Sequence, residues 1–422
     1  MISLTCLLLS ALLLAGPGEG VVLMQDATSL VRPEYRALAS KLAIAPAYAP
    51  TSGNEFIILN TGRDFGEMLY KDFNDAGRLI EFELFLFGFD KDGVIVRDTL
   101  FSKVRQGVEV RYTHDSFGNF FDSIFDGRPV FKGFYDDMLR GGINLRDFTP
   151  WWNLHRTYSN AGRRQHRKII IMDEKVAYTG GMNFTEGSLS GWGDCMLRIT
   201  GPAVTDLRAI WAQNWNSMAK KKSDRVDLDI RLSEDAPTES GKILQVVPDG
   251  PDMPAYMAEE AIVWALENAK EYVWFQTPYF IPTSTVLRAM KKAAERGLDV
   301  RVIVPLVGDL PAIEPTIRSY FKTCVKSGVK IYQRYPPFDH SKTFLCDDYL
   351  VSIGTTNLDK LSLKRIYEVN TYIYDEETAL SYKHLFLERQ ANSEPVTEEL
   401  FDTWTSGEKF KQGLMRIVSP WL

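Results

Sequence analysis

Cysteine and histidine are scarce in this chain. Its 422 residues include four cysteines and five histidines. One cysteine, Cys6, lies in a segment that we expect to be removed, and the other three show no spacing typical of metal ligands. The sequence therefore predicts buried free thiols, no disulfide framework, and no metal or other cofactor. The three remaining cysteines are Cys195, Cys324 and Cys346.

Positive charge and long apolar runs are also limited. The net charge of −6 leaves no overall basic surface, which argues against nucleic acid as a partner. The apolar run at residues 2–15 is too short to cross a bilayer comfortably and fits the apolar core of a signal peptide. Because no Lys or Arg precedes the run, a short uncleaved membrane anchor is the alternative. Either interpretation of residues 1–20 predicts an exported, membrane-associated protein.

One stretch occurs twice. The first copy runs from His166 to Asn183, and the second begins 174 residues later and runs from His340 to Asn357. In both copies Lys follows His by two positions, Asp by seven, Gly by fourteen and Asn by seventeen, and an acid follows by twenty-eight. Such a repeat indicates a duplicated unit. The residues in register are His166, Lys168, Asp173, Gly180, Asn183 and Asp194, and then His340, Lys342, Asp347, Gly354, Asn357 and Glu368.

Each copy has the pattern of two strands joined by a tight turn. The apolar runs 168–172 and 342–346 are typical of buried strands, and residues 176–179 and 350–353 return as second strands. His and Lys stand two apart on the first strand, so their side chains share one face. The Gly and Asn come back to the level of the strand's start. Each copy therefore brings an imidazole, an ammonium and a carboxamide together, whereas the turn aspartate is expected to bond backbone groups.

Two such clusters facing each other would suit the chemistry of a phosphodiester. One neutral His can attack phosphorus, and the other, protonated, can give its proton to the leaving oxygen. The Lys and Asn side chains would stabilise charge on the non-bridging oxygens, each contributing roughly 10²–10³ in rate. The acid twenty-eight positions on is well placed to orient the imidazole. A pair of structural histidines in a core is the alternative.

The pattern H-x-K-x4-D followed by G-x-x-N, present twice, resembles the phospholipase D superfamily. Further blocks of sequence are most similar to those of bacterial cardiolipin synthases. They are GDCMLRITGPAV, QVVPDGPD, TPYFIP and EVN. The resemblance implies an α/β fold of two pseudo-symmetric halves. Each half would be a mixed β-sheet flanked by helices, and the two would share one active site with a phosphohistidine intermediate and no metal. One chain would then suffice for a complete site.

The resemblance also implies individual roles. His166 is expected to be the nucleophile and His340 the general acid and then the base. The acids would be exchanged between halves, so that Glu368 orients His166 and Asp194 orients His340. Arg164 and Tyr279 are candidate substrate contacts, and the loop that contains Asp115 and Gly118 is expected near the site. Aromatic residues beside Arg156, Arg163 and Arg164 suit either a lipid interface or core packing.

The alternation of strand and helix patterns predicts a parallel or mixed sheet in each half. The expected division is an N-terminal extension at 21–76 that wraps the first half, a first half at 77–218, a linker at 219–241 and a second half at 242–422.

Three functions are compatible with these patterns. The first is transfer of a phosphatidyl group from one anionic phospholipid to an alcohol at a membrane surface, with cardiolipin as product. The second is hydrolysis by the same mechanism, as a phospholipase D or as a phosphodiesterase or nuclease. The third, a non-catalytic lipid-binding protein, predicts a lost His or Lys in one copy, and both copies retain them.

Overall fold

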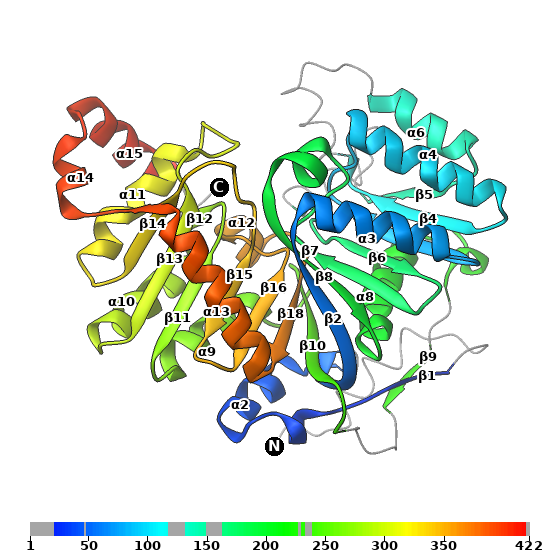
Figure 1. Cartoon of the computed structure of the whole chain (residues 1–422), viewed down its shortest axis with the longest axis horizontal. Coiled ribbons are helices and arrows are strands. Elements are labelled where there is room, and N and C mark those ends of the chain that lie inside the picture. Colours follow the sequence, from blue (N-terminus) through cyan, green and yellow to red (C-terminus); the bar gives the residue numbers. More distant parts are fainter. Residues whose placement is uncertain are drawn as a thin grey trace.

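The computed structural model describes residues 21–45, 48–116, 131–148, 163–226, 229–232 and 239–418. Within this part of the chain, one mixed sheet of 15 strands contains two units of matching strand order (Figure 1). In sheet order the first unit is β5 (Asn144–Asp147), β4 (Glu109–His114), β3 (Leu79–Leu84), β6 (Ile169–Met172), β7 (Val176–Gly180) and β8 (Gly193–Thr200). The second is β14 (Lys330–Arg334), β13 (Asp299–Pro305), β11 (Tyr272–Gln276), β15 (Thr343–Cys346), β16 (Leu350–Gly354) and β18 (Glu368–Tyr374), and β19 (Ser393–Pro395) extends its outer edge. The predicted α/β fold with two related halves is confirmed.

Two central strands join the units. β2 (Thr51–Thr61) pairs with β8, β10 (Lys242–Asp249) pairs with β18, and the two also pair with each other. Each is followed by a helix, α3 (Gly62–Asp75) after β2 and α9 (Met257–Asn268) after β10. β2 and α3 therefore begin the first half as β10 and α9 begin the second. The boundary expected at residue 77 falls inside the first half.

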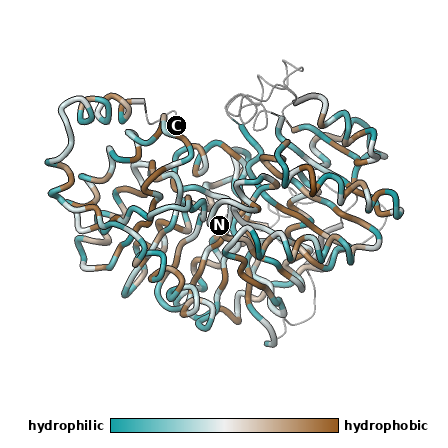
Figure 2. The backbone as a smooth tube through the Cα atoms, turned by 45° about the horizontal axis from the view of Figure 1, so that its top comes forward, coloured by the Kyte–Doolittle hydropathy of each residue, from teal (hydrophilic) through white to brown (hydrophobic). Residues whose placement is uncertain are grey.

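Helices cover both faces of the sheet. On one face the first unit carries α3, α4 (Lys91–Arg105) and α6 (Phe131–Arg140), and the second carries α9, α10 (Ser284–Glu295) and α11 (Glu314–Val325). On the other face lie α8 (Ala203–Ser217) and α13 (Glu376–Ala391), over a core that includes strands of both units. Figure 2 shows that hydrophobic stretches of the backbone recur throughout both units. A core shared by both units favours one rigid body, because apolar contacts continue from one half to the other.

The expectation that residues 21–76 wrap the first half is wrong for α2 (Pro33–Leu42). Its buried Tyr35, Leu38 and Leu42 belong to the core of the second unit, and the hydroxyl of Tyr35 donates to the carbonyl oxygen of Cys346 at 3.3 Å. The linker also contains a short strand, β9 (Asp229–Leu232), which pairs in parallel with β1 (Val21–Met24). The smaller pair β12 (Phe280–Ile281) and β17 (Leu358–Asp359), with α12 (Lys360–Lys364), lies in the second unit.

The two turn aspartates bind backbone as predicted, but the backbone is that of a segment distant in sequence and not of their own turn. The Asp173 carboxylate accepts hydrogen bonds of 2.7–2.9 Å from the backbone N–H groups of residues 77–79. Asp347 does the same with residues 270–272 at 2.9–3.1 Å. Each carboxylate thus fastens its hairpin to the start of the neighbouring strand, β3 or β11. The His and Lys of each copy were expected on the first strand of the hairpin, but they lie in the segment directly before it, because β6 begins at Ile169 and β15 at Thr343.

The three described cysteines are buried and free, as expected. In the described part of the chain, none of the helices has the length and apolar character needed to cross a bilayer. Residues 1–20, where a signal peptide or anchor was expected, lie outside the described residues.

Candidate active site

The two histidines meet where the halves join. The backbone N–H of His166 donates to the carbonyl oxygen of Tyr367 in the second half at 2.9 Å. The backbone N–H of His340 donates to the carbonyl oxygen of Gly193 in the first half at 2.8 Å. Each of these acceptors directly precedes one of the predicted acids. The backbone therefore places each His beside the acid of the opposite half.

The side chains complete this exchange. His166 Nδ1 lies 2.9 Å from both carboxylate oxygens of Glu368, and His340 Nδ1 lies 2.9 Å from Oδ2 of Asp194. The acids thus lie where they were expected, beside the histidines of the opposite halves, and their orienting role stays a prediction. In the tautomer with the proton on Nδ1, which an ionised carboxylate favours, each Nε2 is the nitrogen that can attack phosphorus or carry a transferable proton.

The two pairs differ in how the acid is held. The hydroxyl of Thr355 donates to Oε2 of Glu368 at 2.5 Å and accepts from the backbone N–H of Val369 at 2.9 Å. In the first half the position of Thr355 is taken by Gly181, and Asp194 Oδ1 accepts directly from the N–H of Cys195 at 2.7 Å. A Cβ on Gly181 would stand 2.0 Å from Asp194 Oδ1. The shorter acid therefore occupies the space that a hydroxyl fills in the other half.

The lysines are buried beside their own histidines. Lys168 Nζ donates to the carbonyl oxygen of His166 at 2.8 Å, and Lys342 Nζ donates to that of His340 at 2.5 Å. Burial lowers the pKa of Lys168 to about 7 and that of Lys342 to about 8, against the pull of the Glu368 and Asp194 carboxylates. A bound phosphodiester would supply negative charge that favours the ammonium form of both.

Burial also disfavours charge on the imidazoles. Desolvation and the Lys168 charge hold the pKa of His166 well below its ordinary value. For His340, burial and Lys342 lower the pKa, while the hydrogen bond to Asp194 raises it. Burial opposes charge on Asp194 too, yet Lys342 and His340 hold the pKa of that carboxyl below its usual range. Because the acid beside His340 is ionised, the His340 imidazole holds a second proton more readily than the His166 imidazole does.

The motif Asn and Gly residues have distinct surroundings. Asn183 Oδ1 accepts from the backbone N–H of Leu86 at 3.3 Å, which leaves its N–H₂ group as the possible donor to a phosphate oxygen. Asn357 is buried, and its Oδ1 has no hydrogen-bond donor within the described ranges. A Cβ on Gly180 would meet the carbonyl oxygen of Cys195 at 2.3 Å, and one on Gly354 would meet Asn370 Oδ1 at 2.1 Å. Both glycines allow strands to pass closely.

The two candidate substrate contacts have different places. The ring of Tyr279 lies 6.3 Å from that of His340, and its hydroxyl donates to the carboxylate of Asp309 at 2.8 and 3.0 Å. The carbonyl oxygen of Arg164 accepts from the N–H of Tyr367, so this residue helps to join the halves, and burial lowers the pKa of its guanidinium. Gly118, Arg156 and most of the aromatic segment 149–164 lie outside the described residues.

Aromatic neighbours of the histidines were missed by the sequence reasoning. The ring of Phe85 lies 5.0 Å from that of His166, and the rings of Trp192 and Phe338 lie 5.8 and 5.9 Å from that of His340. Trp192 and Phe338 come from opposite halves and contact each other with ring centroids 5.0 Å apart. The available signal was that both aromatic residues stand two positions before a site residue, Asp194 or His340.

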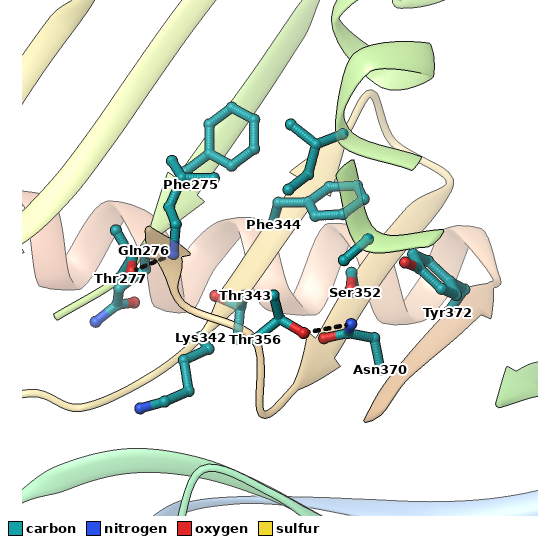
Figure 3. Close-up of a pocket in the computed structure, with 13 residues that line it drawn as sticks. Phe275, Gln276, Thr277, Lys342, Thr343, Phe344, Ser352, Thr356, Asn370 and Tyr372 are labelled. Carbon is teal, nitrogen blue, oxygen red and sulfur yellow. Dashed lines mark hydrogen bonds between the residues drawn. The ribbon is translucent and has the colours of Figure 1, made fainter. Parts of the chain in front are cut away.

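A small cavity of about 30 Å³ lies behind Lys342 in the second half (Figure 3). Phe275, Phe344 and Leu358 provide apolar walls, and Asn370 Nδ2 donates to Thr356 Oγ1 at 2.7 Å at its polar side. In Figure 3 the Lys342 side chain extends away from the two phenylalanine rings. A space of this size holds water but no phospholipid headgroup. The substrate is therefore expected on the side to which Lys342 Nζ points.

The lysine pKa values predict an alkaline limit to activity. A lysine is charged below its pKa, so kcat/KM is expected to fall as pH rises from about 7 to above 8, when free Lys168 and then Lys342 lose their protons. Replacing Lys168 with arginine should shift the first part of this fall in kcat/KM to higher pH, because a guanidinium stays charged. The maximal rate of this variant should be lower. The measurement is a kcat/KM profile against pH for both proteins. An alkaline limb at the same pH in both would contradict this role of Lys168.

The difference between the two acids predicts a compensating pair of substitutions. Gly181→Thr alone should push the Asp194 carboxylate off His340 and lower kcat about 10²-fold or more. Gly181→Thr combined with Asp194→Glu rebuilds the Thr–Glu arrangement of the second half and should recover much of that loss. Steady-state kinetics of the three proteins test this. The matched control is Gly66→Ala, whose Cβ would make only ordinary contacts at 3.7 and 3.8 Å. A double variant no better than Gly181→Thr would refute the prediction.

Comparisons with known proteins agree with this geometry. The family model described as "Cardiolipin synthase, PLD-like domain" matches residues 69–215 and 262–389. Cardiolipin synthase 1 of Staphylococcus aureus is 31% identical over 377 residues, which cover 88% of this chain and 74% of that protein. Cardiolipin synthase of Clostridium perfringens is 30% identical over 371 residues, covering 84% of this chain and 74% of that protein. The crystal structure of phosphatidylserine synthase from Haemophilus influenzae has a similar fold, with a TM-score of 0.63, 13% identity, and coverage of 87% of this chain and 95% of that one.

Proposed function

The chain belongs to the family of cardiolipin synthase, phospholipase D-like domains, and we propose that it transfers a phosphatidyl group between phosphatidylglycerol molecules to form cardiolipin. The observation that carries this proposal is the pair of imidazoles, each oriented at Nδ1 by the acid of the other half. The relatives named cardiolipin synthase support the choice of lipid and of alcohol acceptor.

In the first step of the proposed reaction, Nε2 of His166 attacks the phosphorus of one phosphatidylglycerol. A P–N bond forms and the bond from phosphorus to the glycerol oxygen breaks, while His340 Nε2–H gives its proton to that oxygen. The Lys168 and Lys342 ammonium groups and the Asn183 amide stabilise charge on the non-bridging oxygens. Glycerol leaves, and the phosphatidyl group remains on His166.

In the second step the neutral His340 takes a proton from the glycerol hydroxyl of another phosphatidylglycerol. That oxygen attacks phosphorus, the P–N bond breaks, and cardiolipin leaves with His166 restored. The assignment of His166 as nucleophile follows the family resemblance and is supported by the low pKa of its imidazole. The ionised Asp194 beside His340 supports the role of His340 as acid.

We also propose that the enzyme acts at a membrane surface. A phosphatidyl donor and acceptor both reside in a bilayer, so we propose an anionic membrane surface as the working partner of an exported protein. One chain supplies both histidines, and no second copy is needed for the chemistry.

The test is to incubate the purified full chain with phosphatidylglycerol and to quantify cardiolipin, glycerol and phosphatidic acid. Cardiolipin and glycerol in equal amounts are expected. Phosphatidic acid as the main product, with glycerol but little cardiolipin, would instead establish a hydrolase of the same mechanism. The matched control is His384→Ala, which removes an exposed histidine on α13 and should leave the rate unchanged, whereas His166→Ala should abolish both products.

A further inference from the structure

The helix α15 (Ser406–Val418) turns its apolar side away from the protein. Phe410, Leu414 and Ile417 follow one another at spacings of four and three residues, and they are 75%, 52% and 73% exposed. Side chains at these spacings form one stripe on a helix. A surface helix of a globular protein ordinarily buries such a stripe in the core. We name these three residues the outward face.

The opposite side of α15 is polar and packs on the protein. Gln412 is buried. Arg416 Nη1 donates to the carbonyl oxygen of Ser319 on α11 at 2.5 Å, and its guanidinium lies 4.2 Å from the ring centroid of Tyr320. Figure 1 shows α15 next to α11. The helix therefore packs on the protein through this side, and its outward face is exposed to a partner.

The charges around the outward face are positive. At 100° per residue, Lys409 and Lys411 lie on either side of the stripe, and both are exposed. An apolar stripe flanked by lysines is typical of helices that lie in the plane of a membrane, because the rings and aliphatic groups enter the lipid while the ammonium groups reach the headgroups. The helix contains one acid, Glu408, so its own charge is positive although the whole chain carries −6.

The loop that begins α11 connects this surface to the active site. Residues 306–313 carry Asp309, which holds the hydroxyl of Tyr279 beside His340. The same loop exposes Val307 and Leu310, at 63% and 38%. Exposed apolar groups therefore occur both on the loop that borders His340 and on the helix that packs against α11.

We propose that the outward face of α15, together with Val307 and Leu310, docks the protein on an anionic phospholipid bilayer and so presents the mouth of the active site to lipid. This inference rests on the proposed function, which requires a substrate held in a bilayer. Apolar area placed in lipid would stabilise the bound state, and the two lysines would add attraction to anionic headgroups. Docking through this face makes the rate on bilayers depend on residues that take no part in the chemistry.

The test compares one reaction on two forms of substrate. The full chain and a Phe410→Gln/Ile417→Gln variant are assayed on phosphatidylglycerol vesicles and on a short-chain phosphatidylglycerol dissolved as monomers. The vesicle rate of the variant is expected to fall at least about tenfold, since each apolar side chain loses its burial in lipid, while its rate on dissolved substrate stays unchanged.

The matched control is Ile57→Gln/Leu139→Gln, which changes two apolar residues that are 44% and 52% exposed on β2 and α6. It should leave both rates unchanged. Lys409→Glu/Lys411→Glu should weaken sedimentation with phosphatidylglycerol vesicles and leave that with phosphatidylcholine vesicles as it was.

Three results would overturn the docking surface. The first is an unchanged vesicle rate in the Phe410→Gln/Ile417→Gln variant, and the second is an equal fall of its rate on both substrates. The third is that the full chain forms a dimer, which this variant dissociates without loss of vesicle rate. A full chain that turns over neither substrate would refute the proposed function instead. In that case weaker sedimentation of the Phe410→Gln/Ile417→Gln variant with vesicles would still support docking.

Discussion

Replacing His340 with alanine is expected to slow cardiolipin formation by at least about 10³-fold and to leave a phosphatidyl group on His166 when the donor has an activated leaving group. From a phosphatidyl ester of p-nitrophenol, p-nitrophenolate leaves without a proton from His340, so His166 can still attack phosphorus and the first step proceeds. The second step then lacks the base that activates the incoming alcohol. The adduct should be found by mass spectrometry of the intact protein and of its peptides.

His166→Ala under the same conditions should form no adduct at all, and His384→Ala should turn over as the unchanged protein does. The geometry alone treats the two imidazoles alike, because both have Nδ1 occupied by a carboxylate. An adduct on His340 in the His166→Ala protein, with none on His166 in the His340→Ala protein, would reverse the assigned roles.

Replacing either acid with its amide is expected to give the second largest effect. Glu368→Gln and Asp194→Asn should each lower kcat by roughly 10²–10⁴-fold, because an amide can hold the imidazole in the wrong tautomer and cannot stabilise an imidazolium. KM should change little, since the acids bond to imidazole Nδ1. Steady-state kinetics on dissolved short-chain phosphatidylglycerol separates the two parameters.

A matched control for these variants is Glu377→Gln, which changes an exposed acid at the start of α13. It should keep both kcat and KM. If Glu368→Gln or Asp194→Asn raised KM while leaving kcat intact, the acids would serve substrate binding, and their orienting role would be wrong.

Much of the site could be predicted because it repeats in sequence. The His, Lys and acid positions recur at the same spacings in both copies. The turn position of Asp173 and Asp347 predicted bonds to backbone, but not that the bonded segments, residues 77–79 and 270–272, would be distant in sequence. Exchange of Glu368 and Asp194 between halves needed the family resemblance, because nothing local links residue 166 to residue 368.

The missed features depend on contacts between distant segments. β2 occupies the middle of the sheet, although its sequence TSGNEFIILNT shows little alternation, because its pairing with β8 and β10 outweighs local preference. α2 packs on the second half because its apolar side fits that core. The sequence shows Gly181 where the second copy has Thr355, but the reason for the difference is structural. A Cβ on Gly181 would stand 2.0 Å from Asp194 Oδ1.

The stereochemical course at phosphorus tests the central claim most directly. Two successive in-line displacements, first by His166 and then by the acceptor hydroxyl, each invert the phosphorus centre. A phosphatidylglycerol made chiral at phosphorus with sulfur in place of one non-bridging oxygen should therefore yield product with the original configuration retained. Inversion would mean that the acceptor attacks phosphorus directly, and it would contradict a covalent intermediate on either histidine.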